Sequence, residues 1–180
     1  MISGPSGSGK STITASVLER TGSRFSVSMT TRSPRAGEVN GQSYHFVTQD
    51  EFKEKIANDS LLEWAEVFGN YYGTPAGPVQ QAIDAGETMI LEIDIQGGLQ
   101  VATHRPDATF ILVVPPSLDE LKRRLAGRGT EDAATVDRRF SKAQHELNTA
   151  RESGVYTREV VNDNLDHAIE QVTRIIEEQS

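Results

Sequence analysis

Residues 4 to 11 carry the pattern whose residue types and spacing are most specific to one kind of chemistry. The segment fits the phosphate-loop pattern G-x-x-x-x-G-K-[ST] at every fixed position and reads Gly4-Pro5-Ser6-Gly7-Ser8-Gly9-Lys10-Ser11. Its glycines let backbone N–H groups turn toward phosphate oxygens, and the positive end of the helix expected next faces the same place. Lys10 can then reach the β- and γ-phosphates of a nucleoside triphosphate, and the Ser11 hydroxyl can bind Mg²⁺. The alternative is a chance Gly/Ser-rich loop, and the helical pattern after Lys10 counts against it.

Polar residues between positions 30 and 86 suit a second anion. Arg32 and Arg35 are three residues apart in a turn stiffened by Pro34, so both guanidinium groups could face one phosphate monoester. Tyr44 and Tyr72 could add hydroxyl donors, or each could be a core residue with its hydroxyl at the surface. The residues alone leave these two interpretations of each tyrosine open.

Three carboxylates have sequence positions that indicate a role in binding. Glu63 is flanked by Leu62 and Trp64, which is a costly environment for a carboxylate without a partner, unless it faces outward on an alternating strand. Glu92 and Asp94 come at the end of an expected strand, and the carboxyl ends of parallel strands border the ligand crevice. Sequence reasoning leaves the separate roles of Glu92 and Asp94 open.

Strand-like apolar runs alternate with helical patterns along most of the chain. Strands are expected at 25–28, 89–93, 110–114 and 159–161, and helices at 10–19, 95–104, 117–126, 135–151 and 165–178. Ser117 with Glu120, and Thr48 with Glu51, have the spacing of capping boxes at helix starts. The alternation predicts an α/β fold with a doubly wound parallel sheet covered on both faces.

Two stretches interrupt this alternation. Residues 30–86 are rich in Gly, Tyr and polar side chains, and are expected to form an inserted lobe with strands at 44–47 and 61–67 and a helix at 75–85 that Gly86 closes. Residues 127–135 read as a mobile flap within a lid at about 127–139, and residues 1–29 and 87–180 as the core domain. Because only Met1 to Ser3 precede the loop, we expect further residues upstream to complete the first strand.

Composition narrows the functional classes. The net charge of −8 disfavours binding to nucleic acid or anionic membrane, so clusters of Arg point to a small anionic ligand. The chain has no Cys, which excludes disulfides and thiolate chemistry and fits a cytoplasmic protein. No apolar run approaches the roughly 20 residues of a membrane span, and His45, His104, His145 and His167 lack metal-site spacing.

Several ordered motifs resemble the guanylate kinase family from Ile2 to the last helix. They are the segments 28–41, 44–47, 63–66, 69–74, 91–97, 115–117, 124–131 and 161–163. The resemblance implies a P-loop NTPase fold with an inserted GMP-binding lobe and a mobile lid. It also implies transfer of the γ-phosphoryl group of Mg·ATP to GMP, with dGMP as a further acceptor. Because two substrates must meet without water, lobe and flap are expected to close over the sheet.

The resemblance also implies the site residues. ATP is expected to bind to Gly4, Pro5, Ser6, Gly7, Ser8, Gly9, Lys10, Ser11, Thr12, Arg124, Arg128 and Asn162, the last near the adenine. GMP is expected to bind to Ser28, Arg32, Arg35, Glu38, Tyr44, Glu63, Tyr72, Thr74, Glu92, Asp94 and Arg139, with Glu63 accepting from the guanine N1–H and N2–H₂. The charge-neutralising catalytic residues are expected to be Lys10, Arg32, Arg35, Arg124, Arg128 and Arg139. Ser11 is the expected Mg²⁺ ligand, Glu92 could hold a water on that ion, and Arg123 and Arg138 are assigned to a solvated face.

Two other functions fit parts of the sequence. Guanylate-kinase-like domains in scaffold proteins can bind phosphopeptides without catalysis, but those usually lack a working phosphate loop. A sugar-phosphate kinase could use the same scaffold, but Glu63 and the segment from Arg32 to Tyr44 fit a nucleotide acceptor better. The oligomeric state is left open.

Overall fold

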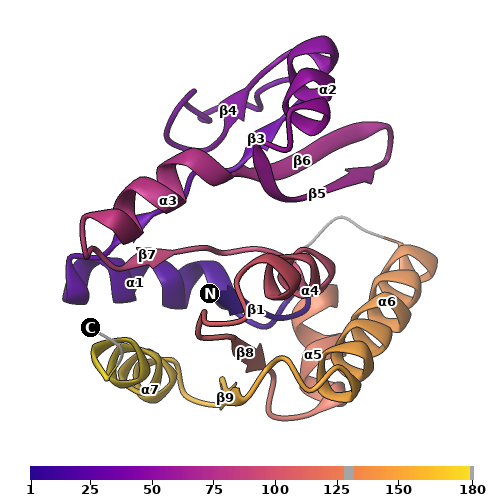
Figure 1. Ribbon diagram of the computed structural model, residues 1–180. Coiled ribbons are helices and arrows are strands. Elements are labelled where there is room, and N and C mark those ends of the chain that lie inside the picture. Colours follow the sequence, from indigo (N-terminus) through magenta and orange to yellow (C-terminus); the bar gives the residue numbers. More distant parts are fainter. Residues whose placement is uncertain (128–131, 179–180) are drawn as a thin grey trace.

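The computed structural model describes residues 1–127 and 132–178 and contains a parallel core sheet and a second, smaller sheet (Figure 1). In the core, β1 (Ile2–Ser3) pairs with β8 (Ile111–Val114), which pairs with β9 (Arg158–Val161), and β2 (Arg24–Phe25) pairs with β7 (Met89–Ile90). A parallel bridge between Ile2 and Glu92 joins the two sets, and Ile2 N–H donates to the Leu91 carbonyl at 2.9 Å. The resulting order β2-β7-β1-β8-β9 confirms the predicted parallel α/β fold.

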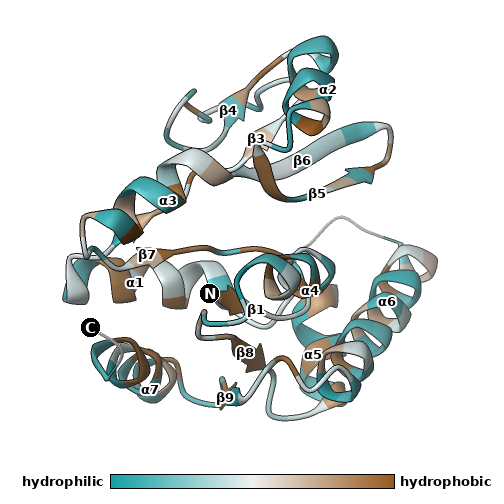
Figure 2. Cartoon of the chain, viewed as in Figure 1, coloured by the Kyte–Doolittle hydropathy of each residue, from teal (hydrophilic) through white to brown (hydrophobic). Residues whose placement is uncertain are grey.

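Helices cover both faces of this sheet because the side chains of β8 alternate between two cores. Ile111 and Val113 pack with apolar residues of α1 (Lys10–Thr21) and α7 (Leu165–Glu177). Leu112 and Val114 pack with residues of α4 (Ile95–His104), α5 (Leu118–Ala126) and α6 (Ala133–Glu152). Figure 2 colours β8 as hydrophobic along its length, as expected of a strand that is buried on both faces.

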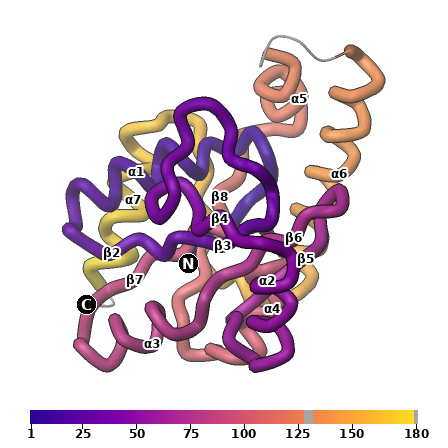
Figure 3. The backbone as a smooth tube through the Cα atoms, turned by 90° about the horizontal axis from the view of Figure 1, so that it is seen from above, coloured from indigo at the N-terminus to yellow at the C-terminus, as the bar shows by residue number. Residues whose placement is uncertain are grey.

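The second sheet is formed by the segment that interrupts the strand–helix alternation, residues 30–86 of the sequence, together with Met29. Its strands are β3 (Met29–Thr30), β4 (His45–Phe46), β5 (Leu61–Val67) and β6 (Asn70–Pro75), in the order β4-β3-β6-β5. Phe52 of α2 (Gln49–Ala57) packs against Met29 and Leu61 beneath this sheet. The helix α3 (Ala76–Asp84) leads back to the core and ends before Gly86, whose φ is 69°. Figure 3 shows the β5–β6 hairpin extending toward α6.

Several expected boundaries differ from those observed. The expected strand 25–28 is divided, because Ser26 N–H still donates to the Ile90 carbonyl of the core while the Ser28 carbonyl accepts from His45 N–H of the second sheet. The prediction missed β6, which pairs antiparallel with β5. The helix expected from 135 begins at Ala133, capped by Asp132, and residues 128–131 of the expected flap lie outside the described residues.

One of the two predicted capping boxes is present. Thr48 and Glu51 satisfy each other's backbone N–H groups, as predicted. Ser117 accepts from Glu120 N–H at 3.1 Å, but the Glu120 carboxylate accepts from Arg123 and Arg124 at 2.7 Å instead of returning to Ser117. The second box is therefore incomplete because two arginines compete for its acid.

Candidate active site

The phosphate loop has the backbone that its glycines allow. Gly4, Gly7 and Gly9 have φ values of 155°, 88° and 93°, and Gly9 is the N-cap residue of α1. A side chain at Gly4 would collide with the Val113 carbonyl at the end of β8. Lys10 Nζ donates to the carbonyls of Gly4 at 2.6 Å and Pro5 at 3.2 Å, so its ammonium group lies inside the curve of the loop.

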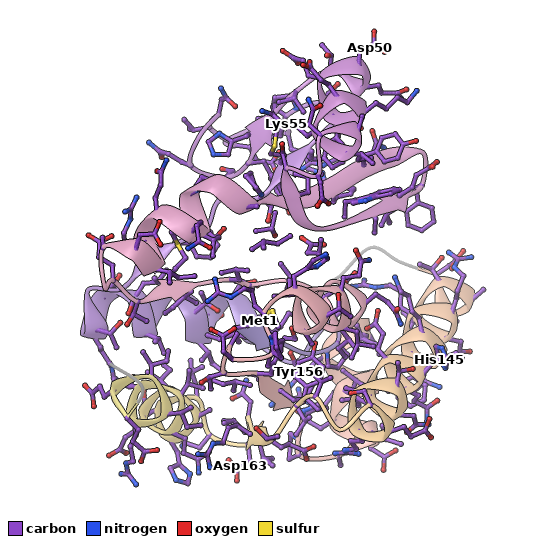
Figure 4. The ribbon with its side chains drawn as sticks, in the orientation of Figure 1. Met1, Asp50, Lys55, His145, Tyr156 and Asp163 are labelled. Carbon is purple, nitrogen blue, oxygen red and sulfur yellow. The ribbon has the colours of Figure 1, made fainter. Side chains whose placement is uncertain are left out.

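Asn162 fixes the loop from the opposite side. Its side chain is 6% exposed, and Nδ2 donates to the Ser8 carbonyl at 2.8 Å. A side chain at Gly9 would collide with the same Nδ2 atom. This amide faces the backbone of the phosphate loop, while the following Asp163 points away at the surface (Figure 4). Asn162 therefore connects the end of β9 to the loop. The expected position of Asn162 near the adenine stays a prediction.

One arginine of the expected catalytic set contacts the loop, and another contacts Asn162. Arg139 of α6 donates from Nη2 to Ser6 Oγ at 2.9 Å. Arg124 donates to the Asn162 carbonyl at 2.9 Å and to Glu120 at 2.7 Å. Arg128 lies outside the described residues. Arg123 pairs with Glu120 and its side chain is 76% exposed, as expected for a solvated face.

A hollow of about 730 Å³ opens above the loop. Part of its lining comes from α6, which contributes Thr135, Arg138, Arg139, Lys142, Ala143 and Glu146. Arg138 was assigned to the solvated face, and Lys142 and Glu146 were not singled out at all. Their spacing of three and four places them on one face of α6, which was a usable signal. Phe68, at the turn of the β5–β6 hairpin, lines the hollow as well.

Ser11 and Glu92 meet at the floor of the site. Ser11 Oγ donates to Glu92 Oε1 at 2.6 Å, and Glu92 is held beside β1 through the bridge to Ile2. Hydroxyl and carboxylate oxygens are the hard donors that Mg²⁺ prefers. Among the described residues no group of three or more acidic, cysteine or histidine side chains is placed to hold a metal ion.

A second hollow, of about 260 Å³, adjoins the first. Most of the residues predicted to bind GMP line it, namely Ser28, Tyr44, Glu63, Tyr72, Glu92 and Asp94. Asp94 lines both hollows and is also the N-cap residue of α4, where its Oδ1 accepts from Gly97 N–H at 2.8 Å. The two hollows therefore share one wall, and molecules bound in them would lie side by side.

Glu63 is the buried carboxylate of the second hollow. It is 8% exposed, and its Oε1 accepts from Thr74 Oγ1 at 2.6 Å. Burial raises the pKa of Glu63 to about 7, and the nearby charge of Asp94 adds to this, while the Thr74 hydrogen bond acts in the opposite direction. Glu63 is therefore an acceptor whose ionisation changes close to neutral pH.

Arg32 and Glu38 form an ion pair beside Tyr44, which lines the second hollow. Arg32 donates from both Nη atoms to the Glu38 carboxylate, at 2.8 and 2.9 Å, and its guanidinium carbon lies 5.5 Å from the centre of the Tyr44 ring. Glu38 also accepts from the backbone N–H of Arg35 at 2.7 Å. The hydrogen bonds from Arg32 and Arg35 lower the pKa of Glu38 to about 2. Glu38 thus orders the turn that carries both arginines.

His145 and Tyr156 line neither of the two hollows. Figure 4 places His145 on the outer side of α6, directed away from the core. Tyr156 donates to the Ile95 carbonyl at 3.3 Å, and burial raises its pKa to about 12, so it is a structural residue behind α4. None of the helices in the described parts of the chain has the length and apolar character needed to cross a bilayer.

Comparisons with known proteins agree with this geometry. A family model described as Guanylate kinase matches residues 1–179. Guanylate kinase of Clostridium perfringens (strain SM101 / Type A) is 49% identical over 177 residues, covering 98% of this chain and 81% of its own length. Guanylate kinase of Synechocystis sp. is 46% identical over 180 residues, covering 99% of this chain and 93% of its own.

Comparison with solved structures supports the same family at the level of the fold. The crystal structure of guanylate kinase from Anaplasma phagocytophilum has a TM-score of 0.78 at 30% identity and covers 99% of this chain and 83% of that one. A sugar kinase from Janibacter sp. HTCC2649, at 17% identity and a TM-score of 0.51, shares only the fold. Matches over nearly its whole length, with a phosphate loop beside a buried carboxylate, show that the chain belongs to the guanylate kinase family.

Proposed function

We propose that this protein transfers the γ-phosphoryl group of ATP to GMP, and also to dGMP. One observation carries the proposal: the hollow above the phosphate loop adjoins a hollow that contains a buried carboxylate, and Asp94 lines both. A triphosphate in the first and a monophosphate in the second would face each other across this shared wall. The non-catalytic alternative would have no use for an intact Lys10 and Ser11 within the loop.

The acceptor phosphate supplies its own nucleophile. A GMP phosphate oxygen is already anionic, so the reaction needs positioning and charge neutralisation more than a general base. Arg32, Arg35, Tyr44 and Tyr72 are proposed to hold this phosphate, and Arg32 would do so with its guanidinium already ordered by Glu38. Two guanidinium groups on one monoester would orient the attacking oxygen toward the loop.

The donor phosphates are proposed to lie on the loop N–H groups beneath Lys10 and Arg139. Lys10 would exchange its bonds to the Gly4 and Pro5 carbonyls for phosphate oxygens, and Arg139 would do the same with its bond to Ser6. Arg124 and Arg128 are proposed to assist, and Asn162 to keep the loop in place. Comparable arginines are worth about 10³ in rate.

Base selection is proposed to rest on Glu63. Ionised Glu63 accepts two hydrogen bonds, which matches the adjacent N1–H and N2–H₂ donors of guanine, with Ser28 and Thr74 beside it. Adenine would present its N1 acceptor to this carboxylate and leave a buried charge unpaired. Mismatches of this type can reduce kcat/KM by factors of about 10⁴.

The Ser11 and Glu92 oxygens fit a Mg²⁺ ion that accompanies ATP. Ser11 would be a direct ligand, and Glu92 would accept from a water on the ion. When bound, the ion neutralises charge on the β- and γ-phosphates. Residues 30–86 are proposed as the GMP lobe, residues 127–139 as the lid, and the rest as the core of a cytoplasmic enzyme with no nucleic-acid or membrane partner.

A coupled assay tests the proposal. The purified protein with Mg·ATP should release ADP with GMP as acceptor, and much more slowly with AMP, UMP, CMP or no acceptor. Lys10→Ala should abolish this turnover, whereas Lys53→Ala, which removes an exposed lysine of α2, should not change it. GMP binding without turnover in any condition would favour the phosphopeptide-binding alternative and would refute the kinase proposal.

A further inference from the structure

Strand β5 is fixed to the core by a side-chain amide. This strand lies at one edge of the second sheet, with β6 as its neighbour. Gln100 of α4 extends to this strand: Trp64 N–H donates to Gln100 Oε1 at 3.1 Å, and Gln100 Nε2 donates to the Trp64 carbonyl at 3.0 Å. The amide therefore satisfies both backbone groups of Trp64, in the way that the backbone of a neighbouring strand would.

The residue held in this way is next to Glu63. Gly97, one helical turn before Gln100 on α4, has its Cα so close to Glu63 that an added Cβ would lie 2.8 Å from Glu63 Oε2. Residues three apart on a helix share a face, so Gly97 and Gln100 act on the same part of β5. Gly97 leaves room for the carboxylate, and Gln100 sets where the strand that carries it lies.

Packing alone does not fix the distance between β5 and α4. A hollow of about 80 Å³ lies between β5 and α4 and is lined by Glu63, Trp64 and Gln100 among others. The strand has space to move toward or away from α4 if the amide is removed. Because a displacement of about 1 Å at a binding group can reduce rates by about 100-fold, such freedom matters for a carboxylate that must meet two base donors.

We propose that Gln100 is a positioning residue for base recognition: its amide fixes β5 on α4 and thereby holds Glu63 against the guanine edge of the acceptor. The inference rests on the proposed function, in which Glu63 is the guanine acceptor. Gln100 itself lines neither the hollow above the loop nor the second hollow. It acts through the backbone of the residue that follows Glu63.

The test removes the two hydrogen bonds and keeps the length of the side chain. Gln100→Met should raise the KM for GMP about tenfold, the value expected for two neutral hydrogen bonds, and should leave the KM for ATP unchanged. Gln80→Met, at an exposed glutamine of α3 that bonds only to surface groups, is the matched control and should change neither constant. If Gln100→Met does not fold, as judged by circular dichroism, the shorter amide of Gln100→Asn replaces it.

A double-mutant cycle separates positioning from general loosening of the structure. In a Glu63→Gln background Gln100→Met should no longer raise the KM for GMP, because the group it positions has lost its function. An unchanged KM for GMP in the single variant, an equal rise in the KM for ATP, or the full effect in the Glu63→Gln background would each overturn the inference. Lack of GMP turnover by the wild-type protein would instead refute the proposed function, and this inference with it.

Discussion

The buried Glu63 carboxylate should make the protein less stable as the pH rises, and the isosteric variant Glu63→Gln should remove this effect. In the folded protein the pKa of Glu63 is about 7, against an ordinary value of 4.5. A carboxyl whose pKa is raised keeps its proton in the folded state at pH values where the unfolded chain has already lost it. Folding stability therefore falls as the pH rises from about 4.5 to about 7, and remains lower above that range.

The size of the effect follows from the two pKa values. Each pH unit between them is worth about 1.4 kcal/mol, so ionised Glu63 destabilises the fold by about 3 kcal/mol at pH 8. The amide of the Glu63→Gln variant carries no charge and can still accept from Thr74, so the variant should be more stable than the wild type by this amount. For a chain of this length the gain corresponds to a rise in Tm of roughly 6 to 12 °C.

Thermal unfolding followed by circular dichroism at pH 4 and pH 8 measures the difference. The gain should be near zero at pH 4, where the carboxyl is protonated in both states, and full at pH 8. Glu66→Gln, at an exposed glutamate of the same strand, should show no comparable gain. A Glu63→Gln protein that is no more stable than wild type at pH 8, or whose advantage is the same at both pH values, would refute the reasoning. The same variant should bind GMP more weakly, with a KM for GMP that can still be measured, because an amide offers one acceptor and one donor in place of two acceptors.

Three further predictions concern groups around the two hollows. Asn162→Ala should raise the KM for ATP about tenfold, because the Ser8 carbonyl loses its buried donor. Initial rates at varied ATP concentrations measure this KM, and an unchanged value would show that the loop keeps its conformation without Asn162. Glu38→Gln should raise the KM for GMP more than it changes kcat, since the Arg32 guanidinium loses its ionic partner; an equal effect on the KM for ATP would contradict this. Phe68→Asn should raise Tm by roughly 2 to 4 °C. The φ of Phe68 is 51°, a left-handed conformation that costs most residues about 1 kcal/mol and that Asn adopts more easily. A lower Tm by calorimetry would count against this prediction.

Local patterns in the sequence predicted the core of the fold well. Apolar runs and 3.6-residue stripes identified the parallel strands and their covering helices, because these patterns directly reflect burial on two faces. The divided strand after Phe25 could not be predicted, since Ser26 and Ser28 bond to different sheets and nothing local distinguishes them. The strand β6 was missed because its strand character depends on pairing with β5.

The candidate site was predictable in its residues more than in their contacts. Glu63 stood out because a carboxylate between apolar neighbours needs a reason, and the structure buries it. Asn162 was singled out by resemblance, which gives a position in the chain but not the direction of the amide, here toward the Ser8 carbonyl. Gln100 gave no signal, because its partner Trp64 is 36 residues earlier and the contact exists only after α4 and β5 have come together.

Because the side chains of β8 alternate between two cores, the position of the phosphate loop depends on the packing of both. The strand places Ile111 and Val113 in one core and Leu112 and Val114 in the other. At its end the Val113 carbonyl limits Gly4, and the Val114 carbonyl accepts from Asn162 N–H at 2.8 Å. A substitution that leaves a cavity in either core would therefore shift β8, and this shift would reach the phosphate loop. Natural selection for catalysis would then also constrain apolar positions on both faces of the sheet, including those of α7, far from any substrate.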